Sequence, residues 1–140
     1  MGWFSNDDLF TVDFEGVELE TPVTADSDSG ARVNGRLQTK RGSDDYGVKE
    51  IQIYLEGENG TTLLERKSFD QFYVGGAIDR DIPFTVEIDA SRIKSLLEDG
   101  DAIEGKKYGM QSYVIAREAF TGKDRIEDHW SETQEYLQIM

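Results

Sequence analysis

The chain of 140 residues contains no cysteine, one histidine and only two prolines. Without cysteine there are no disulfides, thiolate metal sites or cysteine nucleophiles, so packing and hydrogen bonds alone must stabilise the fold. The single histidine, His129, excludes any site that needs two imidazoles. The length is that of one domain, which we expect over residues 1–140 with a short N-terminal segment at 1–8.

Long apolar runs are also missing. Residues 1–8 form no cationic region, and no apolar stretch of signal-peptide length follows them. A bilayer span needs ~20 apolar residues, and no run approaches that length. We therefore expect a cytoplasmic protein without a membrane span.

Basic residues are scarce, because 15 lysines and arginines stand against 29 acids and the net charge is −14. Such a surface repels phosphate, so we expect no nucleic-acid partner unless a locally basic face exists. The bases gather once, in a cluster that two aspartates follow: Arg32, Arg36, Lys40, Arg41, Asp44 and Asp45. We interpret this cluster as a solvated strand edge or hairpin end.

Alternation of apolar and polar residues dominates the chain and predicts β-strands. The alternating segments are 10–19, 32–40, 50–56, 63–74, 82–88, 108–118 and 135–140, while 125–130 is ambiguous. Gly16 shifts the phase of the first segment, which indicates a bulge. Gly35, on the apolar side of the second, indicates close packing.

Turn and cap signals complete the pattern. Asn59 and Gly60 predict a hairpin with a type I′ turn, in which both residues have positive φ. A short helix is expected near residues 90–98, capped by Asp89 or Ser91 and ended by Gly100. The sequence therefore predicts an all-β fold, a single antiparallel β-sandwich of about seven strands, immunoglobulin-like or arrestin-like, with one short helix.

The sequence contains no complete catalytic motif. In an extended strand His129 and Ser131 share one side while Asp128 points to the other, so these three residues cannot form a relay. Gly75 and Gly76 lack the lysine and hydroxyl residue of a phosphate-binding loop. We expect no catalytic residue, no cofactor and no enzymatic activity.

A metal site is not predicted either. Asp26 and Asp28 match the start of an EF-hand calcium loop. That template requires an oxygen ligand, a glycine and a glutamate at its fifth, sixth and twelfth positions, where this chain has Gly30, Ala31 and Leu37. Whether this loop nevertheless binds calcium is left open.

The N-terminal region is the candidate partner-binding site, since residues 1–31 contain acids but no lysine or arginine. Trp3 and Phe4 precede the first strand and are either a flap over one end of the sandwich or an exposed anchor. The predicted partner-binding residues are Trp3, Phe4, Asp7, Asp8, Asp13, Glu15, Glu18 and Glu20.

Several segments carry a family resemblance. They include a Val-Asn-Gly-Arg-Leu strand from Val33, an Ile-Gln-Ile-Tyr-Leu strand from Ile51 and an Ile-Pro-Phe sequence from Ile82. Together with 9–15 and 107–116, these segments resemble arrestin-like β-sandwiches, among them bacterial sporulation-control proteins. The resemblance implies a non-enzymatic scaffold without a cofactor. The chain departs from the family in having one sandwich instead of two, and a helix at 91–98 in place of a proline-rich turn.

Two functions from different classes follow. The first is a non-catalytic interaction or scaffold domain that binds another protein through an exposed strand edge and acidic loops, an edge that would also allow a homo-oligomer. The alternative is an acidic inhibitor or immunity-type protein that blocks a basic partner, such as a nuclease, with carboxylates in place of phosphates. Salt should strongly weaken binding by an acidic inhibitor. A proline in the exposed edge should abolish binding by strand addition.

Overall fold

A computed structural model describes residues 9–19, 30–39, 46–73, 81–130 and 136–139. These residues form eight strands and one helix. The elements are β1 (Phe10–Leu19), β2 (Ala31–Thr39), β3 (Tyr46–Gly57), β4 (Gly60–Tyr73), β5 (Asp81–Ile88), α1 (Ala90–Glu98), β6 (Lys107–Glu118), β7 (Asp124–Trp130) and β8 (Tyr136–Gln138).

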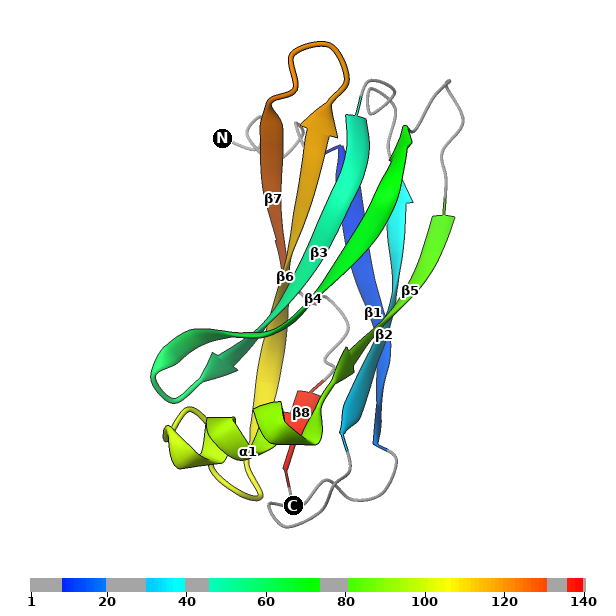
Figure 1. Ribbon diagram of the computed structural model, residues 1–140. Helices are drawn as coiled ribbons and strands as arrows, with labels where there is room; N and C mark the ends of the chain where they lie inside the picture. The colour runs from blue at the N-terminus through cyan, green and yellow to red at the C-terminus, as the bar shows by residue number, and fades with distance from the viewer. Residues whose placement is uncertain (1–8, 20–29, 40–45, 74–80, 131–135, 140) are drawn as a thin grey trace, which may run out of the picture.

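The strands form two antiparallel sheets that pack face to face (Figure 1). One sheet has the order β1-β2-β5, and the other has the order β4-β3-β6-β7, with β8 paired to the first residues of β6. This arrangement confirms the predicted all-β antiparallel sandwich. The ambiguous segment is an edge strand, β7.

One apolar core lies between the sheets, and period-2 alternation builds it. In β2 every second residue from Ala31 to Thr39 is buried. Ile51, Ile53 and Leu55 of β3 have no solvent exposure. As predicted for a central strand, β6 pairs with β3 on one side and with β7 and β8 on the other.

The predicted bulge and the predicted close packing are both present in the three-stranded sheet. The β1–β2 register shifts between Phe14 and Gly16. A Cβ on Gly35 would lie 2.5 Å from the Cζ atom of Phe84 and 2.8 Å from the carbonyl oxygen of Asp13. Glycine at position 35 therefore lets the Phe84 ring lie directly on the β2 backbone.

The hairpin between β3 and β4 is confirmed, but its predicted turn type is wrong. The register pairs Gly57 with Gly60, and Gly60 has a φ of 108°. No described residue other than glycine has a positive φ, so Asn59 cannot belong to a type I′ turn. Glu58 and Asn59 form the turn, and Gly60 takes the left-handed position after it.

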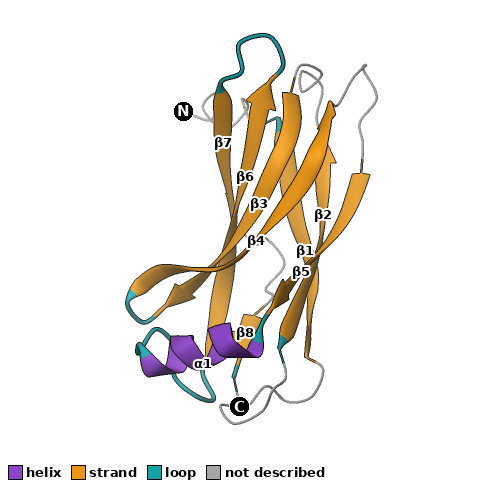
Figure 2. Cartoon of the chain, viewed as in Figure 1, coloured by secondary structure: helices purple, strands orange, loops and turns teal. Residues whose placement is uncertain are grey.

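The helix α1 lies across one end of the sandwich (Figure 2). Asp89 is its N-cap residue, although its side chain makes no capping hydrogen bond. Ile93 and Leu96 are buried, which closes this end of the core. Gly100, with a φ of 75°, follows the C-cap residue and ends the helix as predicted.

A buried carboxylate joins the two sheets at the β1–β7 side. Glu127 of β7 is 5% exposed, and its carboxylate oxygens accept hydrogen bonds from the backbone N–H groups of Leu9 (2.9 Å) and Phe10 (3.2 Å). Arg125 donates from Nε to the same carboxylate at 2.7 Å. The first residues of β1 are thereby attached to the edge of the opposite sheet.

We expect Gly35→Ala to lower the free energy of unfolding by about 1–3 kcal/mol, because the new methyl group must displace the Phe84 ring or the β1 backbone. Gly16→Ala is the matched control, since a Cβ there would have nothing within 4 Å. Its stability should equal or slightly exceed that of the wild type. Urea unfolding measures both, and equal losses would contradict the packing argument.

We expect Glu127→Ala to cost about 3 kcal/mol, because two backbone donors and Arg125 lose their acceptor. Glu127→Gln keeps one oxygen acceptor and should cost about half as much. Ile126→Thr is the control, because Ile126 is 64% exposed on the same strand. Chemical unfolding and hydrogen exchange at the Leu9 and Phe10 amides report the effect. Unchanged exchange in Glu127→Ala would refute it.

Candidate partner-binding site

The outer side of the three-stranded sheet carries mostly charged side chains, and we call it the acidic face. β1 and β5 flank β2 on this face, so the acids of the outer strands lie on either side of the two arginines of the central strand. Its charged residues are Asp13, Glu15, Glu18, Arg32, Arg36, Asp81 and Glu87. Three of the predicted partner-binding residues, Asp13, Glu15 and Glu18, therefore share one surface.

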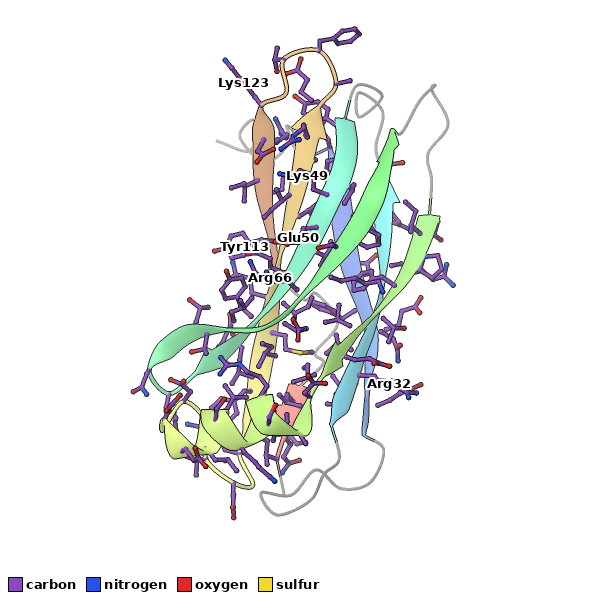
Figure 3. All side chains as sticks on the ribbon, viewed as in Figure 1. Arg32, Lys49, Glu50, Arg66, Tyr113 and Lys123 are labelled. Atoms are coloured by element: carbon purple, nitrogen blue, oxygen red, sulfur yellow. The ribbon has the colours of Figure 1, made fainter. Side chains whose placement is uncertain are left out.

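The arginines of β2 form ion pairs with acids of the neighbouring strands β1 and β5. Arg36 forms ion pairs with Glu15 and, at 3.1 Å, with Asp81. The hydrogen bond to Glu15 and the charge of Asp81 raise the pKa of Arg36 above its usual value. Arg32, which projects outward from β2 in Figure 3, lies 3.4 Å from Glu87.

The sequence interpretation of the basic cluster is a solvated strand edge or a hairpin end, and for Arg32 and Arg36 the strand edge is wrong. β2 is the central strand of its sheet, with β1 on one side and β5 on the other. Strand order depends on contacts between distant segments, and the local charge pattern carries no information on it. Lys40, Arg41, Asp44 and Asp45 lie outside the described residues.

The other predicted partner-binding residues also lie outside the described part of the chain: Trp3, Phe4, Asp7, Asp8 and Glu20. The same holds for Asp26 and Asp28 of the calcium-like loop. Their roles stay predictions.

The acidic face is hollowed at the bulge of β1, and we call this depression the Gly16 hollow. Its volume is about 470 Å³, and the residues around it include Glu15, Gly16, Glu18, Asn34, Pro83 and Thr85. Gly16 contributes no side chain here, which leaves the backbone uncovered. Thr85 donates a hydrogen bond to Asn34 Oδ1 at 2.8 Å, so the polar groups beside the hollow satisfy each other.

A second depression separates the edges of the two sheets at the β4–β5 side, and we call it the edge groove. Its volume is about 530 Å³. The lining residues are Glu65, Arg66 and Lys67 from β4, Thr85, Val86 and Glu87 from β5, and Asp89. β4 and β5 are the outermost strands of their sheets on this side, so their outer backbone groups face this groove.

The β4 side of the groove is protected against pairing with a further strand. Arg92 of α1 donates two hydrogen bonds to the carbonyl oxygen of Leu63, at 3.1 and 2.6 Å. Glu65 and Lys67 pair in register with the buried residues Ile53 and Ile51, so their charged side chains lie on the inward side of the strand. Inward charges and occupied carbonyls are known means of blocking strand addition.

The β5 side carries one such device, Pro83, but among the described residues no side chain is hydrogen-bonded to its outer backbone groups. Pro83 lies in a continuous register with β2, without a bulge, and it has no N–H to donate. Proline is accommodated there only when its nitrogen faces away from the neighbouring strand. Because backbone groups alternate sides along a strand, the N–H groups of Thr85 and Glu87 also face away from β2.

A surface that sequence reasoning missed lies at the β6–β7 end of the sandwich. Lys49 (3.2 Å) and Arg117 (3.4 Å) both form ion pairs with Asp124, and the hydrogen bond from Lys49 is the largest cause of the lowered pKa of that carboxyl. Lys123 projects outward just before the start of β7 (Figure 3), and Phe120 at the hairpin tip is 82% exposed. Lys49 is far from the others in sequence, so only the β3–β6–β7 pairing unites these cations.

The described ranges hold no candidate metal centre. No group of three or more histidine, aspartate or glutamate side chains there could hold a metal ion. His129 and Asp128 lie on β7, paired in register with Ser112 and Tyr113 of β6, and Ser131 lies outside the description. No described helix is long and apolar enough to cross a membrane.

Comparison with known proteins adds little. No protein-family model and no curated protein matches the chain. A putative late embryogenesis abundant (LEA) protein, solved in solution, is 12% identical with a TM-score of 0.49, over 98% of this chain and 76% of its own. A protein from Archaeoglobus fulgidus, solved by crystallography, is 10% identical with a TM-score of 0.46, over 91% of this chain and 100% of its own. Neither similarity assigns a family or a function.

Proposed function

We propose that this protein is a cytoplasmic, non-catalytic interaction domain that binds an extended segment of another protein along the free edge of β5. The supporting observation is the position of Pro83, which directs the N–H groups of Thr85 and Glu87 away from β2 and toward the edge groove. A partner strand would accept these hydrogen bonds and extend the three-stranded sheet. This role agrees with the scaffold function that the arrestin-like resemblance implies.

The distribution of protected edges supports β5 over β1 and β4. The start of β1 already donates its N–H groups to Glu127. β4 is blocked by Arg92 and by its inward charges. Of these three edges, the free edge of β5 is therefore the one most available to a partner segment.

The charges along β5 define the chemistry of the partner segment. Asp81 and Glu87 lie on the acidic face, and Asp89 follows the strand. Side chains of an added strand alternate between that face and the groove. The matching segment carries lysine or arginine at alternate positions, with apolar residues between them that lie over the groove.

The acidic-inhibitor alternative has weaker support on this surface. Arg36 forms ion pairs with Glu15 and Asp81, and Arg32 with Glu87, so two cations compensate part of the negative charge of this face. Among the described residues, only Asp13 and Glu18 of this face have no ion pair. A phosphate mimic needs a row of uncompensated carboxylates, whereas strand addition depends mainly on backbone groups and uses the charges for selectivity.

The proposal can be tested with a synthetic peptide of eight residues, the length of β5, that alternates lysine with valine. We expect amide chemical-shift changes in β5 and at residues 65–67. Thr85→Pro should weaken binding at least about tenfold, because it removes one outward N–H. Thr85→Val is the matched control, since it loses the same hydroxyl but keeps that N–H.

Two control peptides complete the experiment. A peptide with glutamate in place of lysine should not bind. A peptide N-methylated at alternate amides loses the N–H groups that would donate to the outward carbonyl groups of β5, so it tests strand pairing from the partner's side if Thr85→Pro does not fold. Equal binding by Thr85→Pro and Thr85→Val would overturn the proposal, as would shifts confined to the acidic face with a steep loss in salt, which would support the inhibitor function.

A further inference from the structure

The hairpin tip between β6 and β7 carries an exposed phenylalanine, and the Gly16 hollow is a depression with glutamates at its rim. We infer that the protein associates with itself, with Phe120 at the tip of one copy inserted into the Gly16 hollow of a second copy. The inference is independent of the β5-edge function.

The tip presents a phenylalanine on a rigid support. It projects from the end of the sandwich opposite α1 (Figure 1), and Phe120 is the most exposed large apolar residue described. Glu118 and Lys123 are joined by a backbone hydrogen bond of 2.9 Å, Gly122 donates to the Glu118 carbonyl at 2.9 Å, and Thr121 donates to the Glu118 carboxylate at 2.8 Å. An anchor ordered in advance loses little conformational entropy on binding.

The tip and its surroundings carry three cations, Lys49, Arg117 and Lys123, against the two carboxylates of Asp124 and Glu118, in a chain whose net charge is −14. Lys49 and Arg117 share the single carboxylate of Asp124. Lys123 forms no ion pair with a described residue. The tip therefore offers an apolar ring with positive charge beside it, and a complementary site needs an apolar floor with an acidic rim.

The Gly16 hollow has these properties. The exposed ring of Pro83 and the uncovered backbone at Gly16 provide a floor on which an aromatic ring can lie. Glu15 and Glu18 stand at the rim, and Glu18 has no ion pair with a described residue. A volume of about 470 Å³ accommodates a phenyl group together with the end of a lysine side chain.

The contact also limits the types of assembly. Tip and hollow are different surfaces of one chain, so two copies either exchange both contacts in a two-fold dimer or, with one contact per pair, form rings or open chains. A single anchor residue buries less than the ~1,200 Å² of a standard interface, so the association is weak and depends on concentration. At physiological salt, screening over about 8 Å suppresses repulsion between distant acids but leaves the contact pairs effective.

Two single variants and their mixture test the inference in analytical ultracentrifugation. Wild-type protein should gain mass with concentration, whereas Phe120→Ala should weaken association at least about tenfold. Gly16→Leu should do the same by filling the hollow, since the position has open space for a side chain. Mixed together, the two variants should form dimers and nothing larger, because each retains the surface that the other lacks.

A charge exchange provides the second test. Lys123→Glu and Glu18→Lys should each weaken association, and the chain that carries both should recover it. Unfolding curves confirm that all variants are folded, and Phe120→Ala should bind the lysine–valine peptide like the wild type, which separates this contact from the β5 edge.

Three results would overturn the inference. They are a wild type that stays monomeric at every concentration, a Phe120→Ala variant that associates normally, and a monomer that binds vesicles of anionic phospholipid through Phe120. The last result would assign the tip to a membrane surface instead of a second copy.

Discussion

The carboxylate of Glu127 is the connection on which the arrangement of this sandwich depends. Two sheets that share a core still have open sides. There the outermost strand of each sheet has unpaired backbone groups along its outer edge. On the β1–β7 side Glu127 accepts the N–H groups of Leu9 and Phe10 and is itself paired with Arg125. A buried acceptor of this kind closes one side of the sandwich without a further strand and leaves the other side to be covered in a different way.

The β4–β5 side is covered only in part, and this asymmetry underlies the proposed function. Arg92 and the helix α1 protect β4 near Leu63, and the groove remains along Glu65–Lys67 and β5. Proline in an edge strand usually discourages pairing, but at position 83 it also sets which amides face outward. The same residue thus limits non-specific strand addition and leaves Thr85 and Glu87 available to a partner with matching charge.

Charge has a different role on each surface. On the acidic face the arginines of β2 form ion pairs with acids of β1 and β5. These pairs stabilise the sheet and leave few carboxylates without an ion pair. At the β6–β7 end two cations share Asp124, so a basic area exists in a strongly acidic chain. The net charge of −14 therefore describes the average surface, whereas recognition depends on where strand pairing leaves the charges uncompensated.

The sequence by itself determined the strands other than β7, the bulge at Gly16, the helix after Asp89 and the tight packing at Gly35, because each follows from alternation, capping or glycine within a few residues. Tertiary structure decided the rest. The turn at Asn59, the central place of β2, the burial of Glu127 and the grouping of Lys49 with Arg117 all depend on which strands become neighbours. That choice rests on contacts between residues far apart in the chain, and no local pattern of side chains specifies it.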